Sequence, residues 1–276
     1  MHVHKKLDVP VIDSFIQKFA EMYLGQRGKT NFIYSDINES TLYGNLNFST
    51  NILKQIIDKN AVAIDTAREQ GETPSVLRDI YRSDLGELLM TYYFEEKLPD
   101  GERFVIPIKN ITFRERADMP GRGLDAIGFK LVGEDKVEIL LGEAKVSESK
   151  TTPPSVVDVT KDSIFATHTS HRNEAPVVVQ RLSEYAKRLN TADAKILGFA
   201  IVCLDQGIDD SVNITYGCTL IRDFECVNET SDFGKMKLNK QDFEPGKVHF
   251  SILTFSDKTI AETVELFYEK IQELIS

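Results

Sequence analysis

Two apolar stretches that end in charged residues most constrain what this chain can fold into. They lie in the segment GLDAIGFKLVGEDKVEILLGEAKVS, residues 123–147, around a turn at residues 133–135. Successive side chains of a strand point to opposite faces of a sheet. A short turn joins the two stretches as an antiparallel hairpin. Alternation then places two sets of residues on one face, namely Asp125, Ile127, Phe129 and Leu131, and Val137, Ile139, Leu141, Glu143 and Lys145.

This register puts the carboxyl groups of Asp125 and Glu143 opposite each other at the end of an apolar stripe. Facing residues of an antiparallel pair have Cβ atoms about 4.5–5.5 Å apart. Two carboxylates that close repel each other, and partial burial adds to the cost, so we expect a positive group between them. A divalent cation meets that requirement, with Lys145 one step further along the strand. The opposite face of the second strand is also small or apolar, which predicts a central strand covered on both sides.

The spacing of these charged residues resembles the motif of the PD-(D/E)xK nuclease superfamily. Asp125 is followed, after seventeen residues, by Glu143-x-Lys145, and Gly-Leu-Asp stands where the superfamily name has Pro-Asp. The resemblance implies that Asp125 and Glu143 hold Mg²⁺, for which Mn²⁺ substitutes, and that Lys145 helps position or activate the attacking water. The residue types suit that chemistry, because Mg²⁺ prefers carboxylate oxygens and lowers the pKa of a bound water.

Members of the superfamily usually carry a further acidic residue on a helix ahead of the motif. Residues 75–99 read as a helix that begins near Ser75 and ends at Pro99. Glu87 lies off the main apolar stripe of this helix, on a side that other apolar residues share. We therefore expect Glu87 to be the third acid, with Asp84 as the second choice. An ordinary solvated acid on an amphipathic helix is the alternative.

The rest of the chain continues with elements of an α/β fold. A helix over residues 174–190 is followed by a fully apolar strand at 194–204, by strands at 211–221 and 247–255, and by a closing helix near 259–274. Such a succession predicts a parallel crossover. His168 and His171, ahead of the first of these helices, read as part of a polar loop.

These elements predict an α/β fold with a restriction-endonuclease-like (PD-(D/E)xK) core, a mixed sheet flanked by helices. We expect this nuclease domain to span residues 76–276. Residues 1–75 form an N-terminal extension that could dock a partner or cover the active site.

Within the superfamily, the chain resembles a narrower group, the HamA family of nuclease subunits of the bacterial Hachiman antiphage defence system. The residues that carry this resemblance are RSDLGELL (82–89), GRGLDAIGF (121–129) and LLGEAK (140–145), and it covers roughly residues 75–276. It implies Mg²⁺-dependent DNA cleavage by the effector of a defence complex with a superfamily 2 helicase subunit, HamB. Two alternatives stay open, a stand-alone restriction-type endonuclease and a catalytically silent nuclease-fold subunit that serves binding.

Charge and composition set further expectations about partners and location. The net charge of −10 makes the lone chain a poor DNA binder, because non-specific affinity comes from neutralised phosphates. Arg114, Arg116 and Arg122 precede Asp125 and are the expected nucleic-acid contacts, whereas the basic residues of helix 174–190 read as a solvated face. Three widely spaced cysteines, the lack of a signal-like N-terminus and the lack of a long apolar run fit a cytoplasmic protein without a membrane span.

Overall fold

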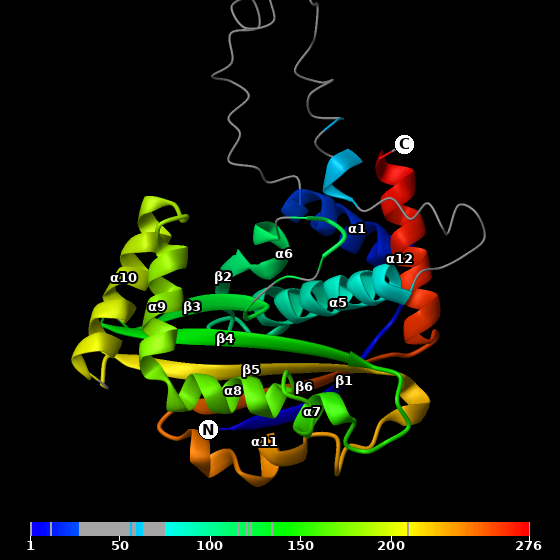
Figure 1. Cartoon of the computed structure of the whole chain (residues 1–276). Coiled ribbons are helices and arrows are strands. Elements are labelled where there is room, and N and C mark those ends of the chain that lie inside the picture. Colours follow the sequence, from blue (N-terminus) through cyan, green and yellow to red (C-terminus); the bar gives the residue numbers. More distant parts are fainter. Residues whose placement is uncertain are drawn as a thin grey trace, which may run out of the picture.

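The computed structural model describes residues 2–11, 13–27, 56, 59–62, 75–114, 116–119, 121, 123–133, 135–208 and 210–275. These residues form a six-stranded sheet with helices on both of its faces (Figure 1). The order of strands across the sheet is β1-β6-β5-β4-β3-β2. Their bounds are β1 Val3–Val9, β2 Val105–Lys109, β3 Ala126–Val132, β4 Lys136–Ser147, β5 Val212–Arg222 and β6 Lys247–Phe255.

The sheet is mixed, as predicted. The strands β2, β3 and β4 pair antiparallel, whereas β4, β5, β6 and β1 pair parallel. The predicted register of the hairpin is confirmed, because Phe129 pairs with Ile139 and Leu131 pairs with Val137. Gly133 adopts a left-handed conformation in the turn, with φ of 70°, which a residue without a Cβ adopts at no steric cost. The hairpin that carries the charged residues therefore forms as its alternation pattern predicts.

The central position of β4 is also confirmed. This strand lies between β3 and β5, and the side chains of Ile139, Leu140 and Leu141 are fully buried. Ile139 and Leu141 belong to the apolar core on one face of the sheet, whereas Leu140 belongs to the core on the other. A strand covered on both faces loses its alternation of apolar and polar residues, and the continuous apolar run in the sequence has this cause.

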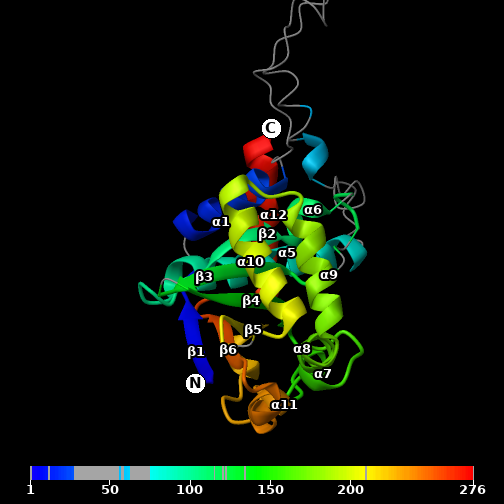
Figure 2. The ribbon, with the colours of Figure 1, turned by 90° about the vertical axis from the view of Figure 1, so that its left-hand side faces the viewer.

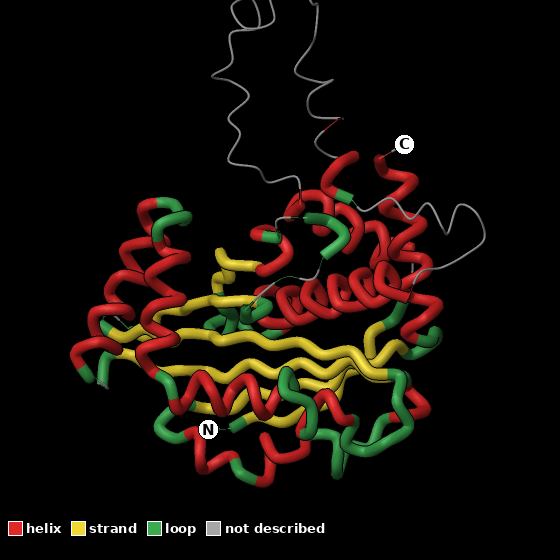
Figure 3. The backbone as a smooth tube through the Cα atoms, viewed as in Figure 1, coloured by secondary structure: helices red, strands yellow, loops and turns green. Residues whose placement is uncertain are grey.

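Helices form two layers around the sheet, as Figures 1 and 3 show. One face is covered by α1 (Asp13–Arg27), α5 (Ser75–Tyr92) and α12 (Ile260–Ile275). The other face is covered by α7 (Ser155–Asp158), α8 (Ile164–Asn173) and α11 (Gly234–Leu238). Two antiparallel helices, α9 (Ala175–Ala186) and α10 (Thr191–Gln206), stand against one end of the sheet (Figures 1 and 2). Short helices lie at η3 Tyr93–Lys97, α6 Asn110–Phe113, η4 Phe224–Cys226 and η5 Lys240–Phe243.

The strand predicted at residues 194–204 is wrong, because this segment is the middle of α10. The side chain of Asn190 caps the helix by accepting hydrogen bonds from the N–H groups of Ala192 and Asp193, each at 3.0 Å. Buried side chains recur every three residues along the helix, while Phe199 and Val202 point outward and are 42% and 58% exposed. A short apolar run cannot by itself distinguish a strand from a buried helix. The connection from β4 to β5 consists of the helices α7 to α10 and contains no further strand among its described residues.

The first residues of the chain belong to the same sheet. Residues 1–75 were expected to form an extension outside the core, yet β1 pairs along its length with β6, from Val3 opposite His249 to Val9 opposite Phe255. The helix α1 packs on α12, where the ring of Tyr23 contacts that of Phe267 at 5.7 Å between centroids. Residues 3–9 therefore contribute an edge strand, and residues 13–27 a covering helix. Residues 28–55 and 63–74 of the expected extension lie outside the described residues.

The other predicted elements agree with the structure. The helix from Ser75, the helix within 174–190, the two strands before the C-terminus and the closing helix correspond to α5, α9, β5, β6 and α12. Across the described ranges, none of the helices combines the length and the apolar character that a membrane span requires.

Candidate active site

The hairpin brings Asp125 and Glu143 together, Asp125 just before β3 and Glu143 within β4. Asp125 directly precedes β3, and its backbone N–H donates to the carbonyl oxygen of Gly142 at 3.1 Å. The Oδ2 atom of Asp125 accepts a hydrogen bond from the N–H of Ala144 at 2.7 Å. These two contacts hold the Asp125 carboxyl beside the backbone on both sides of Glu143, which is the proximity that the sequence predicts.

Glu143 is a buried acid with only one of its carboxylate oxygens in contact with a donor. Its side chain is 6% exposed, and Oε1 lies 2.9 Å from Nζ of Lys145. Its Oε2 atom is buried without a hydrogen-bond partner. Burial, followed by the negative charge of Asp125, raises the pKa of Glu143 to about 8. Burial also raises the pKa of Asp125 to about 6, although the N–H of Ala144 and the charge of Lys145 oppose the rise.

Glu87, on the helix α5, lies close enough to this pair for their charges to affect it. It is 5% exposed, and its Oε2 atom is likewise buried without a hydrogen-bond partner. Burial and then the charges of Asp125 and Asp84 raise the pKa of Glu87 well above its ordinary value, and Glu143 adds to the rise. We call Glu87, Asp125, Glu143 and Lys145 the carboxylate–lysine cluster.

A glycine brings the helix close enough for this cluster to form. A Cβ atom added at Gly86 would lie 2.7 Å from Cγ2 of Val146 on β4, closer than real Cβ atoms come to their neighbours. Glycine weakens a helix interior by about 1 kcal/mol relative to alanine, so its presence here points to a packing requirement. Gly86 lets α5 approach β4 directly beside Glu87.

Asp84, the second choice for the helix acid, has a different environment from that of Glu87. It is fully buried and forms an ion pair with Arg114, whose Nη1 lies 3.0 Å from Oδ2 of Asp84 and whose Nη2 contacts Oδ1. Burial raises the pKa of Asp84, while Arg114 acts in the opposite direction. The charge of Asp84 is thus balanced by a fixed guanidinium, whereas that of Glu87 is not.

The three arginines predicted to contact nucleic acid are not equivalent. The side chain of Arg114 is 2% exposed and pairs with Asp84, which commits its guanidinium to that acid. This buried ion pair joins positions thirty residues apart, which no local pattern indicates. The side chain of Arg116 is 65% exposed and pairs with Asp118 at 2.6 Å. Arg122 lies outside the described residues.

One acid near the cluster was not predicted from the sequence. Asp162 lies between α7 and α8, and its Oδ2 atom is 3.6 Å from Nζ of Lys145. Its side chain is 81% exposed, in contrast to the buried acids of the cluster. Burial lowers the pKa of Lys145, but the charges of Glu143, Asp125 and Asp162 together outweigh this effect and raise the pKa above its ordinary value. Lys145 is therefore a fixed positive charge at neutral pH.

The histidines of the predicted polar loop are instead buried in α8. His168 is fully buried, with its ring against that of Tyr216 at 5.5 Å between centroids. The ring nitrogens of His171 contact the carbonyl oxygen of Thr167 at 2.7 Å and Nη1 of Arg181 at 3.1 Å. Burial lowers the pKa of both imidazoles, so both stay neutral at pH 7. The loop prediction is wrong, because buried residues of one helix face pack against β5.

The carboxylate–lysine cluster supplies ligands of the kind that a hard divalent cation prefers. Among the described residues, no group of three or more aspartate, glutamate, histidine or cysteine side chains converges as a metal site would. Two buried carboxylate oxygens, Oε2 of Glu87 and Oε2 of Glu143, nevertheless lack any donor. Buried acceptors without partners are rare in proteins and call for an ion, a water or a ligand. The donor chemistry of the cluster therefore fits Mg²⁺ or Mn²⁺.

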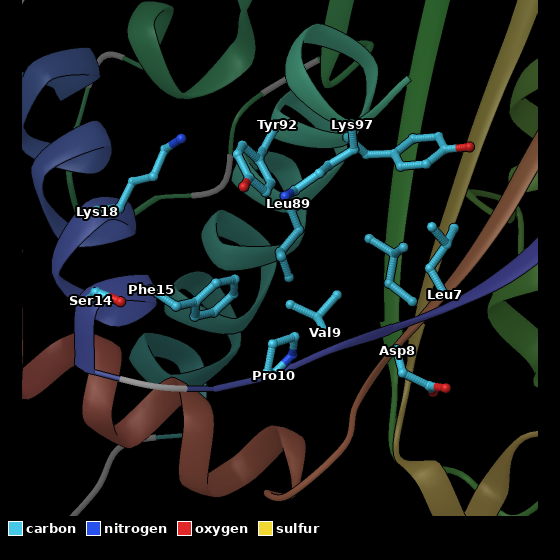
Figure 4. A pocket seen from close by; sticks show the side chains of 12 residues that line it. Leu7, Asp8, Val9, Pro10, Ser14, Phe15, Lys18, Leu89, Tyr92 and Lys97 are labelled. Carbon is cyan, nitrogen blue, oxygen red and sulfur yellow. The ribbon is translucent and has the colours of Figure 1, made fainter. Parts of the chain in front are cut away.

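A separate apolar groove lies between β1, α1 and α5 (Figure 4), with a volume of about 410 Å³. At its mouth the ammonium groups of Lys18 and Lys97 lie 4.3 Å and 5.0 Å from the centroid of the Tyr92 ring. Lys18 also pairs with Glu96 at 2.5 Å. The residues that line this groove include none of the carboxylate–lysine cluster. The groove is thus an apolar surface beside the edge strand and not part of the candidate site.

The fold and the cluster together define an α/β protein with a mixed sheet and buried acids on its central hairpin. The chain belongs to the HamA family, whose model matches residues 30–271. It is therefore a protein of the Hachiman antiphage defence system. The family resemblance in the sequence is confirmed, and the match begins well before residue 75, where that resemblance was expected to start. No curated protein and no solved structure matches the chain.

Proposed function

We propose that this chain is the nuclease of a Hachiman defence complex and hydrolyses phosphodiester bonds of DNA with the help of a divalent metal. The observation that carries this proposal is the pair of buried, unpartnered carboxylate oxygens of Glu87 and Glu143 beside Asp125. Acids crowded in this way repel each other in the metal-free protein, and a divalent cation would remove that repulsion. A purely structural role would favour partners for these oxygens, as Asp84 has.

Asp125, Glu143 and Glu87 are the residues that would hold Mg²⁺, and Mn²⁺ would substitute for it. Their side chains would have to move toward one another, because they do not yet converge as metal ligands do. Bound Mg²⁺ would supply a more acidic water and would neutralise charge that develops at phosphorus. Metal and protons compete for raised-pKa carboxyl groups, so binding should strengthen as the pH rises toward 8, the pKa of Glu143.

Lys145 would act as a positive hydrogen-bond donor. Its pKa lies above the ordinary value, so it holds its proton at neutral pH and does not serve as a general base. An ammonium group 2.9 Å from Glu143 can orient a water or a phosphate oxygen that enters between Glu143 and Asp125. The contact with Glu143 limits the side-chain freedom of Lys145 before substrate binds, which favours a defined geometry.

Glu87 is preferred over Asp84 as the third acid because Arg114 already satisfies Asp84. Binding a metal through Asp84 would require the buried ion pair to break and would leave the guanidinium of Arg114 without its partner. Removing one partner of a buried pair costs about 3–5 kcal/mol. Glu87 has a free oxygen and incurs no such cost.

A helicase partner of superfamily 2, like HamB, would overcome the poor affinity of an acidic chain for DNA. The net charge of −10 repels a polyanion, which restrains cleavage by the lone chain. A partner that engages DNA would raise its local concentration at the nuclease, and this effect requires no change within the active site.

Plasmid cleavage with and without the helicase subunit tests the proposal. In the presence of Mg²⁺, Glu143→Gln and Lys145→Ala should abolish cleavage, and EDTA should do the same. Glu148→Gln is a matched control, because Glu148 follows the same strand but forms surface ion pairs with Arg78 and Arg82. Cleavage by both cluster variants at the parent rate would overturn the proposed site. Strong cleavage by the lone chain, unchanged by the partner, would favour a stand-alone endonuclease, and no cleavage under any condition would favour a silent binding subunit.

A further inference from the structure

A cleft lined by arginines and aromatic rings runs beside the candidate active site. It lies between residues 110–114, 116–119 and 121, which include α6, and one face of α9 with the turn that follows it, and its volume is about 570 Å³. The two helices meet where the ring of Phe113, in α6, contacts that of Tyr185, in α9. The residues that matter most in its lining are Phe113, Arg116, Arg181, Glu184, Tyr185 and Arg188. The cleft therefore joins two segments about seventy residues apart in the sequence.

Two guanidinium groups in this cleft form no ion pair with a carboxylate among the described residues, although the charge of Arg188 helps to lower the pKa of Glu184. Arg181 contacts the imidazole of His171, at 3.1 Å, and Arg188 lies 5.2 Å from the centroid of the Phe113 ring. Within the described part of the chain, neither forms an ion pair with an acid. The acid in the lining, Glu184, pairs with Lys187 at 2.9 Å. On a chain with a net charge of −10, such a concentration of unpaired cations is a local exception that indicates an anionic ligand.

The cleft ends at the segment that carries Asp125. A Cβ atom added at Gly123 would lie 3.6 Å from Nη1 of Arg181 and 3.7 Å from Oη of Tyr185. Gly123 has φ of 99° and precedes Asp125 by two residues. From the opposite wall, the backbone N–H of Asn110 donates to the carbonyl oxygen of Asp125 at 2.8 Å. A strand held in the cleft would thus lead directly to the cluster.

We infer that this cleft binds one strand of nucleic acid, with Arg181 and Arg188 on its phosphates and the Phe113–Tyr185 pair beneath its bases. The inference rests on the proposed function and names how the substrate reaches that site. The two rings lie 5.5 Å apart between centroids, and aromatic rings next to cations form the usual platform for unpaired bases. Arg181 lies within α9 and Arg188 lies in the turn that follows it, so the two guanidinium groups can contact different phosphates of one strand.

Equilibrium binding of a labelled oligonucleotide tests the inference. The full chain would be titrated against a fluorescein-labelled single-stranded DNA 20-mer in EDTA, with anisotropy measured from low to moderate salt. The double variant Arg181→Ala/Arg188→Ala should bind at least about tenfold more weakly, because it loses two phosphate contacts. The slope of log affinity against log salt should also become shallower by about 1.4, or 0.7 for each contact.

Matched variants show whether a loss of binding comes from the cleft, from the lower positive charge of the chain or from a folding defect. Lys195→Ala removes one exposed positive charge from the neighbouring helix α10, outside the cleft lining, and it should bind within twofold of the parent. Arg188→Ala changes an exposed side chain, so we expect the chain to stay folded, which its melting temperature checks. Equal loss of affinity in Lys195→Ala and Arg188→Ala would overturn the inference, and so would a parent chain that binds no oligonucleotide at low salt.

Binding measurements with other nucleic acids identify the ligand. Combined with cleavage assays, they distinguish a failure of this inference from a failure of the proposed function. Single-stranded RNA of the same sequence should bind comparably if phosphates and base faces are recognised, whereas tighter binding of blunt duplex than of either single strand would overturn the inference. Parent-like binding by the double variant, together with loss of cleavage in Glu143→Gln, would refute the cleft and leave the nuclease intact. Reduced binding by the double variant, together with normal cleavage by Glu143→Gln, would refute the active site and leave the cleft intact.

Discussion

Two buried glutamates on β4 should respond in opposite ways to the same substitution. Glu138 is 6% exposed and is satisfied by Lys130, at 3.2 Å, and by contacts with Lys247 and Thr215. Glu143 is as deeply buried but has one lysine and an unpartnered oxygen. We expect Glu143→Gln to stabilise the metal-free chain and Glu138→Gln to destabilise it.

The size of the gain follows from the pKa of Glu143, which burial raises from 4.5 to about 8. An acid with a raised pKa favours the native state fully below pH 4.5, and this contribution is lost as the pH rises toward 8. Each pKa unit corresponds to about 1.4 kcal/mol, so at pH 7 ionisation of the unfolded chain lowers the free energy of unfolding by about 3 kcal/mol. Glutamine cannot ionise and keeps an oxygen acceptor for Lys145. The expected gain is therefore about 2–3 kcal/mol at pH 7 and below about 1 kcal/mol at pH 5.

The loss in Glu138→Gln has another origin and another pH dependence. Although burial opposes it, the contacts with Lys247, Thr215 and Lys130 lower the pKa of Glu138, so its stabilising effect is present at neutral pH and is lost only as the pH falls below 4.5. Removing its charge leaves two partly buried ammonium groups without their acceptor, which costs about 2–3 kcal/mol. That cost should be the same at pH 5 and pH 7.

Urea denaturation in EDTA at pH 5 and pH 7 measures both effects as shifts of the midpoint at constant slope. Two results would refute the reasoning. If Glu143→Gln destabilises the chain as much as Glu138→Gln does, the charge at Glu143 supports the fold. If its gain is equal at both pH values, the raised pKa is not the cause.

Three further predictions concern the metal, the buried ion pair and the partner. Mg²⁺ or Mn²⁺ should raise the melting temperature with saturation, because a ligand of the native state stabilises by mass action, and an equal rise in Asp125→Ala would place the ion elsewhere. Arg114→Ala should cost about 3–5 kcal/mol in urea denaturation by leaving Asp84 buried without its partner, and a cost below about 1 kcal/mol would contradict the ion pair. Cleavage in a co-purified complex with the helicase should drop when the helicase carries an ATPase-dead substitution. An unchanged rate would mean that cleavage does not depend on translocation by the helicase.

The hairpin could be predicted from the sequence because its information is local. A shift of one residue would turn every apolar side chain of β3 to the other face, so alternation alone fixes the register. The turn at Gly133 and the opposition of Asp125 and Glu143 follow from that register. The same local reasoning succeeded for α5 and α12, whose apolar stripes recur at helical spacing.

The features that the sequence did not predict depend on contacts between distant segments. For β1, the pairing partner β6 lies about 246 residues away, and its own residues VHKKLDV show no clean alternation. The ion pair between Asp84 and Arg114 and the approach of Asp162 to Lys145 likewise join positions with no shared pattern. The helix α10 is different, since Asn190 before it and Gly207 after it, with φ of 66°, are local signals of a cap and an end.

The contrast along β4 gives a physical reason to place function at one end of the strand. Glu138 and Glu143 are both buried and only five positions apart. Glu138 has partners for its charge, whereas Glu143 has an oxygen without a partner. Stability alone would favour partners for Glu143 like those of Glu138, since an unsatisfied buried acid costs free energy. Residues that reduce stability without a packing benefit are expected at functional sites. The cleft of Arg181 and Arg188 ends at the same cluster, two residues from Asp125, and presents positive charge where the acids alone would repel a phosphate. In the proposed function the acids would bind a metal ion, and the arginines beside them would bind the phosphates of a nucleic-acid strand.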